Sequence, residues 1–360
     1  MIALFSPSKI YQYRAIIRIP NQSQLVVFIW MATPAMRRLA LVFPGQGSQR
    51  VGMGKDLLAN WPRVAGDVLE EASEAAGLNL RARMLDGPAE QLTSTAVAQP
   101  TLLALSVALL RVLQHETELS PVHLALGHSL GEYSALVAAD ALDLATAARL
   151  VRLRGLAMQR AVAPGVGAMA ALLPVRPQDA ELLCREAAEA TGRVCEVANY
   201  NSSKQTVISG HAEAVKSAIS QARATKKARR AVLLDVSAPF HCALMEPARM
   251  ELHEHLKELL DAEQLRQPKT PVVWNVEAQP TPKSPEQIAL VLEQQVVRPV
   301  RWSESVDLCV DSGVSHFLEL GVGGVLSGLI RQQTQGHEAA VVTTSCGSAE
   351  EIKAFLRTQQ

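Results

Sequence analysis

The stretch that decides the fold is Val122-His123-Leu124-Ala125-Leu126-Gly127-His128-Ser129-Leu130-Gly131-Glu132. Its first five residues form an apolar run typical of a buried parallel strand, and the residues from Glu132 to Ala139 are rich in helix formers. Between them lies a GxSxG motif, in which the two glycines flank a serine because a side chain at either place would collide with neighbouring backbone. The sequence therefore predicts a strained turn between a strand and a helix, with the Ser129 hydroxyl exposed on it.

The regions on either side of this stretch have the same organisation of apolar strands and helices. Residues 39–43 form a short apolar run that ends in a turn at 44–49, and helical patterning then dominates to about Gln114. Further apolar runs at 272–275 and 315–320 favour two more strands. We expect an α/β fold built on a parallel sheet.

A different pattern occupies residues 164–236. Strand-like runs at 167–175, 195–201, 205–210 and 231–236 alternate with helical patterns at 177–190 and 211–225. The order βαββαβ is the ferredoxin-like arrangement. We therefore predict a small subdomain at 164–236, inserted into a large subdomain made of 39–163 and 237–360.

Composition narrows the class of protein. Of the 360 residues, 48% are hydrophobic and 19% charged, and the 35 basic residues balance the 35 acidic ones. This indicates a globular protein with no general affinity for nucleic acid or membranes. The five cysteines are scattered and never form a CxxC pair, so we expect neither a disulfide framework nor a metal site, and a reducing, cytoplasmic location.

The N-terminus is interpreted separately. Residues 1–55 contain no acidic side chain, and the apolar run 25–31 is too short to cross a bilayer. We predict that residues 1–38 are an extension outside the fold, either unstructured or the product of a start upstream of Met31 or Met36. A targeting segment is the alternative, because basic and serine residues without acids are also found in transit peptides.

A serine hydroxyl needs a base, and His241 is the best candidate among the nine histidines. It lies in the apolar stretch 237–245, where a strand gives way to a helix, whereas His253 and His255 lie on a charged helix face. The alternative for His241 is a core histidine that is bonded to backbone.

Arg154 stands out for a different reason. At helical spacing its neighbours Ala147, Leu150, Val151, Ala157, Met158 and Ala161 are all apolar, so its guanidinium is expected on the buried face of a helix. A buried cation requires an anion. Either a protein carboxylate or a substrate carboxylate would serve.

These residues together resemble the malonyl-CoA:acyl carrier protein transacylases of bacterial fatty-acid synthesis and the related acyltransferase domains of polyketide synthases. The matching segments run in order along nearly the whole chain after the first 38 residues or so: 41–49, 127–136, Arg154-Gly155 with Met158-Gln159, Asn199 and Asn201 with 207–210, 240–245 and 299–302. Gly321-Val322-Gly323 departs from the usual Gly-Pro-Gly of the family, which affects only the stiffness of that turn.

The resemblance implies a hydrolase-like core with an inserted ferredoxin-like subdomain and a site in the cleft between them. It implies Ser129 as nucleophile, His241 as base, and the backbone N–H groups of Gln46 and Leu130 as oxyanion hole. A backbone carbonyl at Gln295 would orient His241, and Arg154 would bind the malonyl carboxylate. The other residues that it places at the pocket are Asn199, Asn201, Phe240 and Met158.

The implied substrates are malonyl-CoA and acyl carrier protein, with no metal or redox cofactor. Lys226, Lys227, Arg229 and Arg230 form the densest basic cluster, which is either a docking surface for the acidic carrier or an ordinary solvated helix end. Alternatives for the chain as a whole are a trans-acting polyketide acyltransferase, a serine hydrolase or thioesterase, and an inactive scaffold that binds the carrier.

Overall fold

The computed structural model describes residues 16–18, 26–28, 38–119, 121–337 and 340–359. The chain divides into two compact units, Met1–Arg37 and Arg38–Gln360. In the first unit, β1 (Ile16–Arg18) and β2 (Val26–Phe28) pair antiparallel. The other residues of the predicted extension lie outside the described residues, except Arg38, which begins the first strand of the second unit.

A parallel sheet of five strands forms the centre of the second unit. Its strands follow the order β11-β10-β3-β4-β9, with the bounds Val342–Ser345, Val314–Glu319, Arg38–Phe43, Val122–Gly127 and Val272–Val273. The run predicted at 272–275 pairs only over its first two residues. Beyond them, the Trp274 N–H donates to the Gln279 carbonyl and the Asn275 N–H to the Glu132 side chain. The edge strand β11 was not predicted from the sequence.

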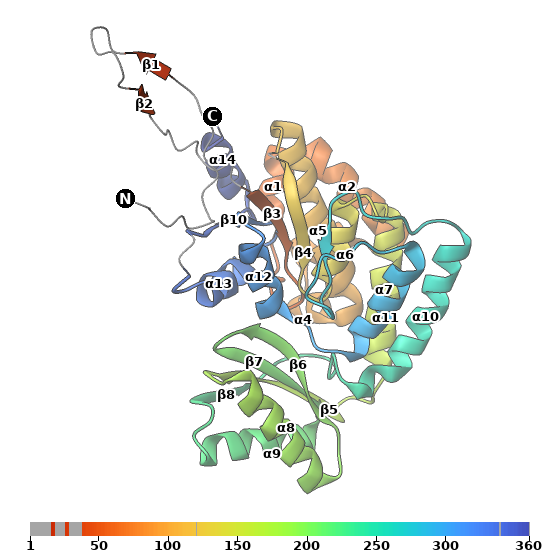
Figure 1. The fold of residues 1–360 in the computed structure, drawn as a ribbon. Helices are drawn as coiled ribbons and strands as arrows, with labels where there is room; N and C mark the ends of the chain where they lie inside the picture. The colour runs from red at the N-terminus through yellow and green to blue at the C-terminus, as the bar shows by residue number, and fades with distance from the viewer. Residues whose placement is uncertain (1–15, 19–25, 29–37, 120, 338–339, 360) are drawn as a thin grey trace. The chain divides into compact units, whose positions relative to one another are not determined.

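Helices cover both faces of this sheet (Figure 1). Leu39, Leu41 and Phe43 of β3 face a core shared with α2, α5, α6 and α7, whereas Ala40 and Val42 face a core shared with α12 and α13. This alternation follows from the two-residue period of a strand. The helices of the region are α1 (Lys55–Asn60), α2 (Pro62–Ala76), α3 (Leu80–Asp86), α4 (Ala89–Thr93), α5 (Thr95–Glu116), α6 (Gly131–Ala138), α7 (Leu144–Arg160), α10 (Glu246–Asp261), α11 (Pro285–Val297), α12 (Trp302–Asp311), α13 (Val325–Gln333) and α14 (Ala349–Arg357).

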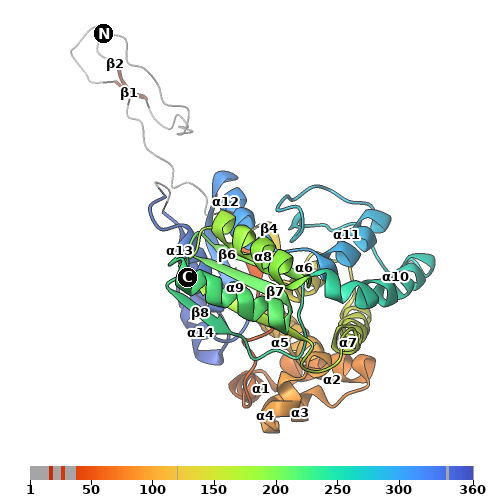
Figure 2. The ribbon, with the colours of Figure 1, turned by 90° about the horizontal axis from the view of Figure 1, so that it is seen from below.

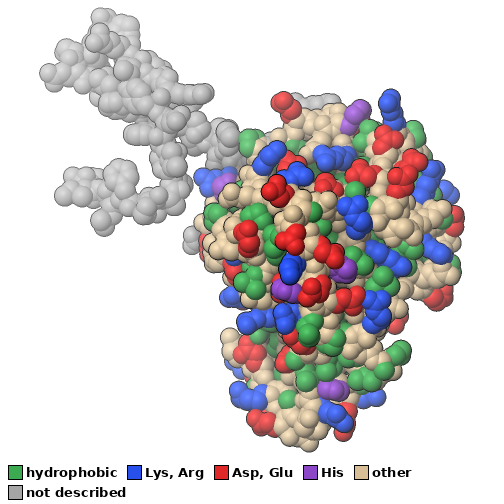
Figure 3. Space-filling model, turned by 90° about the vertical axis from the view of Figure 1, so that its right-hand side faces the viewer, with side chains coloured by type: hydrophobic (Ala, Val, Ile, Leu, Met, Phe, Trp, Pro, Cys, Tyr) green, Lys and Arg blue, Asp and Glu red, His purple; other side chains and the backbone are tan. Residues whose placement is uncertain are grey.

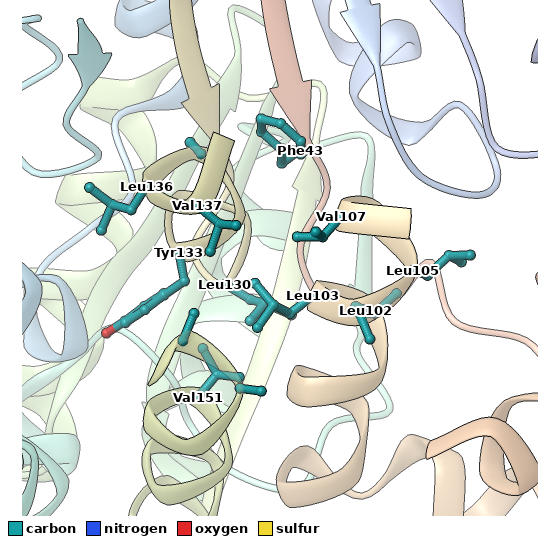
Figure 4. Close-up of a cluster of buried hydrophobic side chains, with 14 of the residues drawn as sticks. Phe43, Leu102, Leu103, Leu105, Val107, Leu130, Tyr133, Leu136, Val137 and Val151 are labelled. Atoms are coloured by element: carbon teal, nitrogen blue, oxygen red, sulfur yellow. The ribbon is translucent and has the colours of Figure 1, made fainter. Parts of the chain in front are cut away.

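Helix α5 is the only helix of the described residues that is long and apolar enough to cross a membrane. However, 89% of its apolar window is buried inside the protein. Figure 4 shows Leu102, Leu103 and Val107 of α5 in the same apolar cluster as Leu130 and Val151. Helix α5 is therefore a core helix.

A second sheet has the predicted βαββαβ order. It is built from β5 (Gly167–Leu173), α8 (Pro177–Thr191), β6 (Cys195–Ser202), β7 (Gln205–His211), α9 (Ala212–Ala224) and β8 (Arg230–Leu233), and its strands lie antiparallel in the order β6-β7-β5-β8. The last strand ends at Leu233, earlier than predicted. Beyond it, the Leu234 N–H still donates to the Met169 carbonyl.

The antiparallel sheet is covered on both faces. Helices α8 and α9 lie side by side over one face (Figure 2), and Ala170, Leu172 and Ile208 pack beneath them. Alternate residues such as Met169 and Val207 point the other way and join the core of the parallel sheet. We call β5–β8 with α8 and α9 the antiparallel-sheet region, and the remaining described residues from Arg38 the parallel-sheet region. The exact boundaries at 163/164 and 236/237 stay predictions.

Candidate active site

Ser129 lies on the turn between β4 and α6, with a backbone φ of 52°. The flanking glycines are required by space: a Cβ on Gly127 would stand 1.9 Å from the Gly131 carbonyl carbon, and one on Gly131 would stand 2.0 Å from the Phe43 carbonyl oxygen. The strain of a non-glycine residue at positive φ is therefore held by close contact between the two neighbouring strand ends.

Gln46 and Leu130 follow the C-terminal ends of the neighbouring parallel strands β3 and β4. Neither of their backbone N–H groups donates to another backbone or side-chain group of the described residues. Leu130 also stands at the N-terminus of α6, the positive end of its dipole. Each of the two turns thus holds one free N–H donor: Gln46 lines the same cavity as Ser129, and Leu130 follows Ser129 in sequence.

His241 approaches Ser129 from the segment before the short 3₁₀ helix Ala243–Met245, and it too has positive φ, at 58°. Its Nε2 lies 2.8 Å from the Ser129 Oγ, and its Nδ1 lies 2.7 Å from the Gln295 carbonyl oxygen. A carbonyl can only accept, so Nδ1 carries the proton and Nε2 is free to accept one from the serine. Burial, together with the nearby charge of Arg154, lowers the pKa of His241 to about 3.

Arg154 projects from α7 and is 1% exposed. Its Nη1 donates to the Gln99 Oε1 at 2.7 Å, and its Nη2 donates to the Gln295 Oε1 at 2.8 Å and to the Ser129 Oγ at 3.2 Å. Arg154 makes no ion pair with a carboxylate among the described residues. The guanidinium therefore lies against the Ser129 hydroxyl, and its hydrogen-bond partners are neutral.

Three residues around the serine were missed from the sequence. Asn275 clamps the turn, since its Oδ1 accepts from the Ser129 N–H at 2.7 Å and its Nδ2 donates to the Gly127 carbonyl at 2.6 Å. Glu132 is fully buried one turn after the serine, and Gln99 bonds Arg154. A signal existed only for Glu132, an acidic residue within the apolar start of a buried helix.

A cavity of about 360 Å³ opens at Ser129. Both regions and the segment that follows β8 contribute to its lining, which consists of Gln46, Gly47, Gln49, Thr93, His128, Ser129, Met169, Asn199, Leu234, Asp235, Val236, Ser237, Phe240 and His241. Of the four residues that the sequence places at the pocket, Asn199 and Phe240 belong to this lining. The structure places the other two behind the wall: Asn201 is bonded to the His128 Nε2 at 2.8 Å, and the Met158 sulfur accepts from the Gln99 amide.

Known proteins were compared with this chain. Residues 40–359 match the acyl transferase domain family. The chain is 44% identical over 297 residues to the malonyl CoA-acyl carrier protein transacylase of Escherichia coli K12, covering 82% of this chain and 93% of the relative.

Solved structures show the same likeness. The malonyl CoA-acyl carrier protein transacylase of Coxiella burnetii aligns with a TM-score of 0.83 at 37% identity, over 89% of this chain and 97% of that one. A malonyl-transacylase solved in complex with its type II polyketide acyl-carrier protein also aligns with a TM-score of 0.83, at 39% identity, over 89% and 99%.

Proposed function

The chain belongs to the family of acyl transferase domains, and we propose that it moves a malonyl group from malonyl-CoA to the phosphopantetheine thiol of acyl carrier protein. One observation carries the proposal: a single line of contacts joins the Gln295 carbonyl, His241 and Ser129, and Arg154 reaches the same serine oxygen. The first three groups activate a nucleophile. The fourth offers a positive charge to an acyl group that ends in a carboxylate.

In the first half-reaction, His241 Nε2 takes the proton of Ser129 as Oγ attacks the thioester carbonyl of malonyl-CoA. The carbonyl oxygen becomes an oxyanion, for which the N–H groups of Gln46 and Leu130 are the donors. The C–S bond then breaks, the leaving sulfur takes the proton from His241, and coenzyme A departs as its thiol. The product is a malonyl ester on Ser129.

In the second half-reaction, the thiol of the carrier gives its proton to His241 and its sulfur attacks the malonyl ester. The C–O bond to Ser129 breaks, and Oγ recovers the proton from His241. The Gln295 carbonyl, as the acceptor for Nδ1, stabilises the imidazolium that forms in each half-reaction.

Arg154 would bind the distal carboxylate of malonate in a bidentate pair. Its present acceptors are neutral amide oxygens, which compete with a carboxylate less than another carboxylate would. A serine hydrolase with the same serine turn does not need a buried cation to bind a substrate carboxylate, so Arg154 favours a transferase.

We place the reaction in fatty-acid biosynthesis, as the relatives' names support, and in the cytoplasm. The five cysteines are buried and free, which is consistent with a reducing compartment. The likeness to a malonyl-transacylase that works with a polyketide carrier, at a similar TM-score, favours polyketide synthesis as the second candidate pathway.

The test is to mix the protein with malonyl-CoA and to search for a malonyl adduct on Ser129 by mass spectrometry, then to add carrier protein. We expect the adduct to form and to move to the carrier, and Ser129→Ala to form none. Persistent absence of the adduct would refute the transferase. An adduct lost to water faster than to the carrier would instead support a hydrolase.

A further inference from the structure

Arg154 poses an electrostatic problem that its direct contacts do not solve. It is buried, and its hydrogen bonds go to the neutral oxygens of Gln99, Gln295 and Ser129. The Tyr133 ring, whose centroid lies 5.4 Å from the guanidinium carbon, also carries no net charge. An isolated buried cation is unfavourable by several kcal/mol. A negative charge should therefore lie close by without touching it.

Glu132 is the carboxylate in the right place. It is fully buried at the start of α6, its Oε1 accepts from the Asn275 N–H at 2.7 Å, and its Oε2 accepts from the Gln295 side-chain amide. Burial raises the pKa of Glu132 to about 7, against the opposing effects of these two hydrogen bonds and of the Arg154 charge. The Gln295 side chain bridges the two groups, since it donates to Glu132 and accepts from Arg154.

The contacts of Gln295 fix the orientation of its side-chain amide. Its Nε2 faces two acceptors, the Glu132 carboxylate and the Ser129 carbonyl at 3.0 Å, and its Oε1 faces a pure donor, Arg154. Reversing the amide would set N–H against N–H at Arg154 and oxygen against oxygen at Glu132. Glu132 therefore decides which end of Gln295 meets the arginine.

We propose that Glu132 is a positioning residue that sets the preference for a carboxylated acyl group, acting on Arg154 through the Gln295 side chain. Above its pKa of about 7, the ionised carboxylate offsets the charge of the guanidinium from a distance, and its contact with Gln295 keeps a neutral oxygen against Arg154. A substrate carboxylate can then bind Arg154 without first displacing an acid of the protein. This inference rests on the proposed malonyl transfer.

The experiment compares kcat/KM for malonyl-CoA and acetyl-CoA in a charge-relocation series. In Glu132→Gln, the new side-chain NH₂ group must face one of the two donors that now bond the carboxylate, the Asn275 N–H or the Gln295 amide. Where it faces Gln295, the Gln295 amide reverses and Arg154 shifts. We expect malonyl transfer to fall about tenfold or more, while acetyl transfer, which has no carboxylate to bind, falls less.

The double variant Glu132→Gln/Gln295→Glu provides the decisive arm. It has the same composition and charge as the wild type and keeps the Gln295 backbone carbonyl for His241, but it moves the acid into direct contact with Arg154. We expect malonyl preference to stay low or to fall further, because the new ion pair competes with the substrate. A return to the wild-type ratio of malonyl to acetyl transfer would overturn the proposal.

Glu319→Gln is the matched control for a purely structural effect. Glu319 is also a fully buried carboxylate, but it accepts from the N–H groups of Leu326 and Ser327 at the start of α13. We expect it to lower the thermal midpoint without altering the ratio. If Glu132→Gln behaves in the same way, Glu132 is only structural. A wild-type protein that forms no malonyl-serine would refute the proposed function instead, which keeps the two failures distinct.

Discussion

The two regions contribute differently to the site. The parallel-sheet region supplies Ser129 and Arg154, each held by buried hydrogen bonds to side chains such as Asn275 and Gln295. The antiparallel-sheet region supplies wall residues, Met169 and Asn199, and leads into the exposed segment 234–237 at the cavity. The reacting groups are thus held by hydrogen bonds within the parallel-sheet region, whereas the antiparallel-sheet region adds buried wall residues and leads into an exposed segment at the cavity.

The largest effect should come from a substitution in the parallel-sheet region, at the serine turn between β4 and α6. Gly131→Ala puts a Cβ 2.0 Å from the Phe43 carbonyl oxygen, so β3 and β4 must separate at their ends. We expect a loss of about 3 kcal/mol in the free energy of unfolding and loss of malonyl transfer. Denaturant unfolding and the Ser129 adduct assay would measure both.

Gly66→Ala is the control for this substitution. Gly66 lies within α2, and a Cβ there meets nothing within 4 Å. Stability should be unchanged or should rise by up to about 1 kcal/mol. Equal tolerance of the two alanines would show that the strand ends are not as rigid as the contacts indicate.

Removing the cation should alter selectivity rather than stop the reaction. In Arg154→Ala the nucleophile, the base and its carbonyl partner remain, but the charge for the substrate's carboxylate is lost. Malonyl transfer should fall about a hundredfold, since a charge-assisted bidentate pair is removed, and acetyl transfer should be spared or rise. The kcat/KM values for the two thioesters decide; an equal fall in both would make Arg154 a structural residue.

The pH dependence sharpens the view of a buried site. Because His241 has its pKa lowered to about 3, it stays neutral and competent as a base well below pH 6. An ordinary histidine would lose activity about thirtyfold at pH 5, whereas kcat/KM for acetyl-CoA, whose transfer does not need the Glu132 charge, should stay nearly flat between pH 5 and 7. In Arg154→Ala the acid limb should move to higher pH, because a repelling charge is gone. A wild-type acid limb near pH 6.5 would contradict the prediction.

The pKa values of His241 and Glu132 also make the stability of the fold depend on pH. The folded His241 binds fewer protons than the unfolded chain below its ordinary pKa, so its contribution is present above that value and is lost as pH falls toward 3. Glu132 acts in the opposite sense in its own window. Its raised pKa favours the folded state below the ordinary value, and this advantage declines as pH rises toward 7.

The smallest effect concerns the exposed basic cluster near the start of β8. Lys226, Lys227 and Arg229 lie between α9 and β8, Arg230 begins β8, and β8 leads toward the cavity wall. On the face that Figure 3 shows, charges of both signs are intermingled. If an acidic carrier docks at this cluster, replacing all four residues by Glu should raise its KM about tenfold at low salt, with malonyl-serine formation unchanged.

The control is charge reversal of Lys353 and Arg357 on α14, which should leave the KM for the carrier unchanged. The difference should shrink as ionic strength rises. A carrier KM that is insensitive to the four-residue reversal at every salt concentration would leave the cluster as a solvated helix end.

Much of the architecture could be predicted from local sequence patterns. The serine turn, the strands on either side of it and the βαββαβ order follow from periodicity and glycine placement within short windows. Strand β11 was missed because it is a short edge strand with exposed or half-exposed side chains, Val342–Ser345, and offers no clear alternation. Strand β8 was predicted to end at residue 236 but ends at Leu233, because apolar residues continue in the sequence past the last residue that pairs.

The hydrogen bonds that hold the site together could not be predicted from local sequence patterns. Gln295 and Ser129 are 166 residues apart, and Asn275 and Ser129 are 146 apart, so nothing in either local sequence indicates the contact. The Gln295 carbonyl could be named only through a family resemblance, because a backbone oxygen belongs to every residue type. Burial of Arg154, in contrast, followed from helical spacing.

The use of a main-chain acceptor for His241 has a consequence for how this enzyme can vary. An aspartate in that place could be lost through a single codon change, and the base would be lost with it. A carbonyl oxygen is inherited by whatever amino acid occupies position 295, so the orientation of the imidazole tolerates mutation there. Evolution, or a protein engineer, can therefore change the side chain at 295 to seek new acyl specificities while the proton-transfer machinery is preserved.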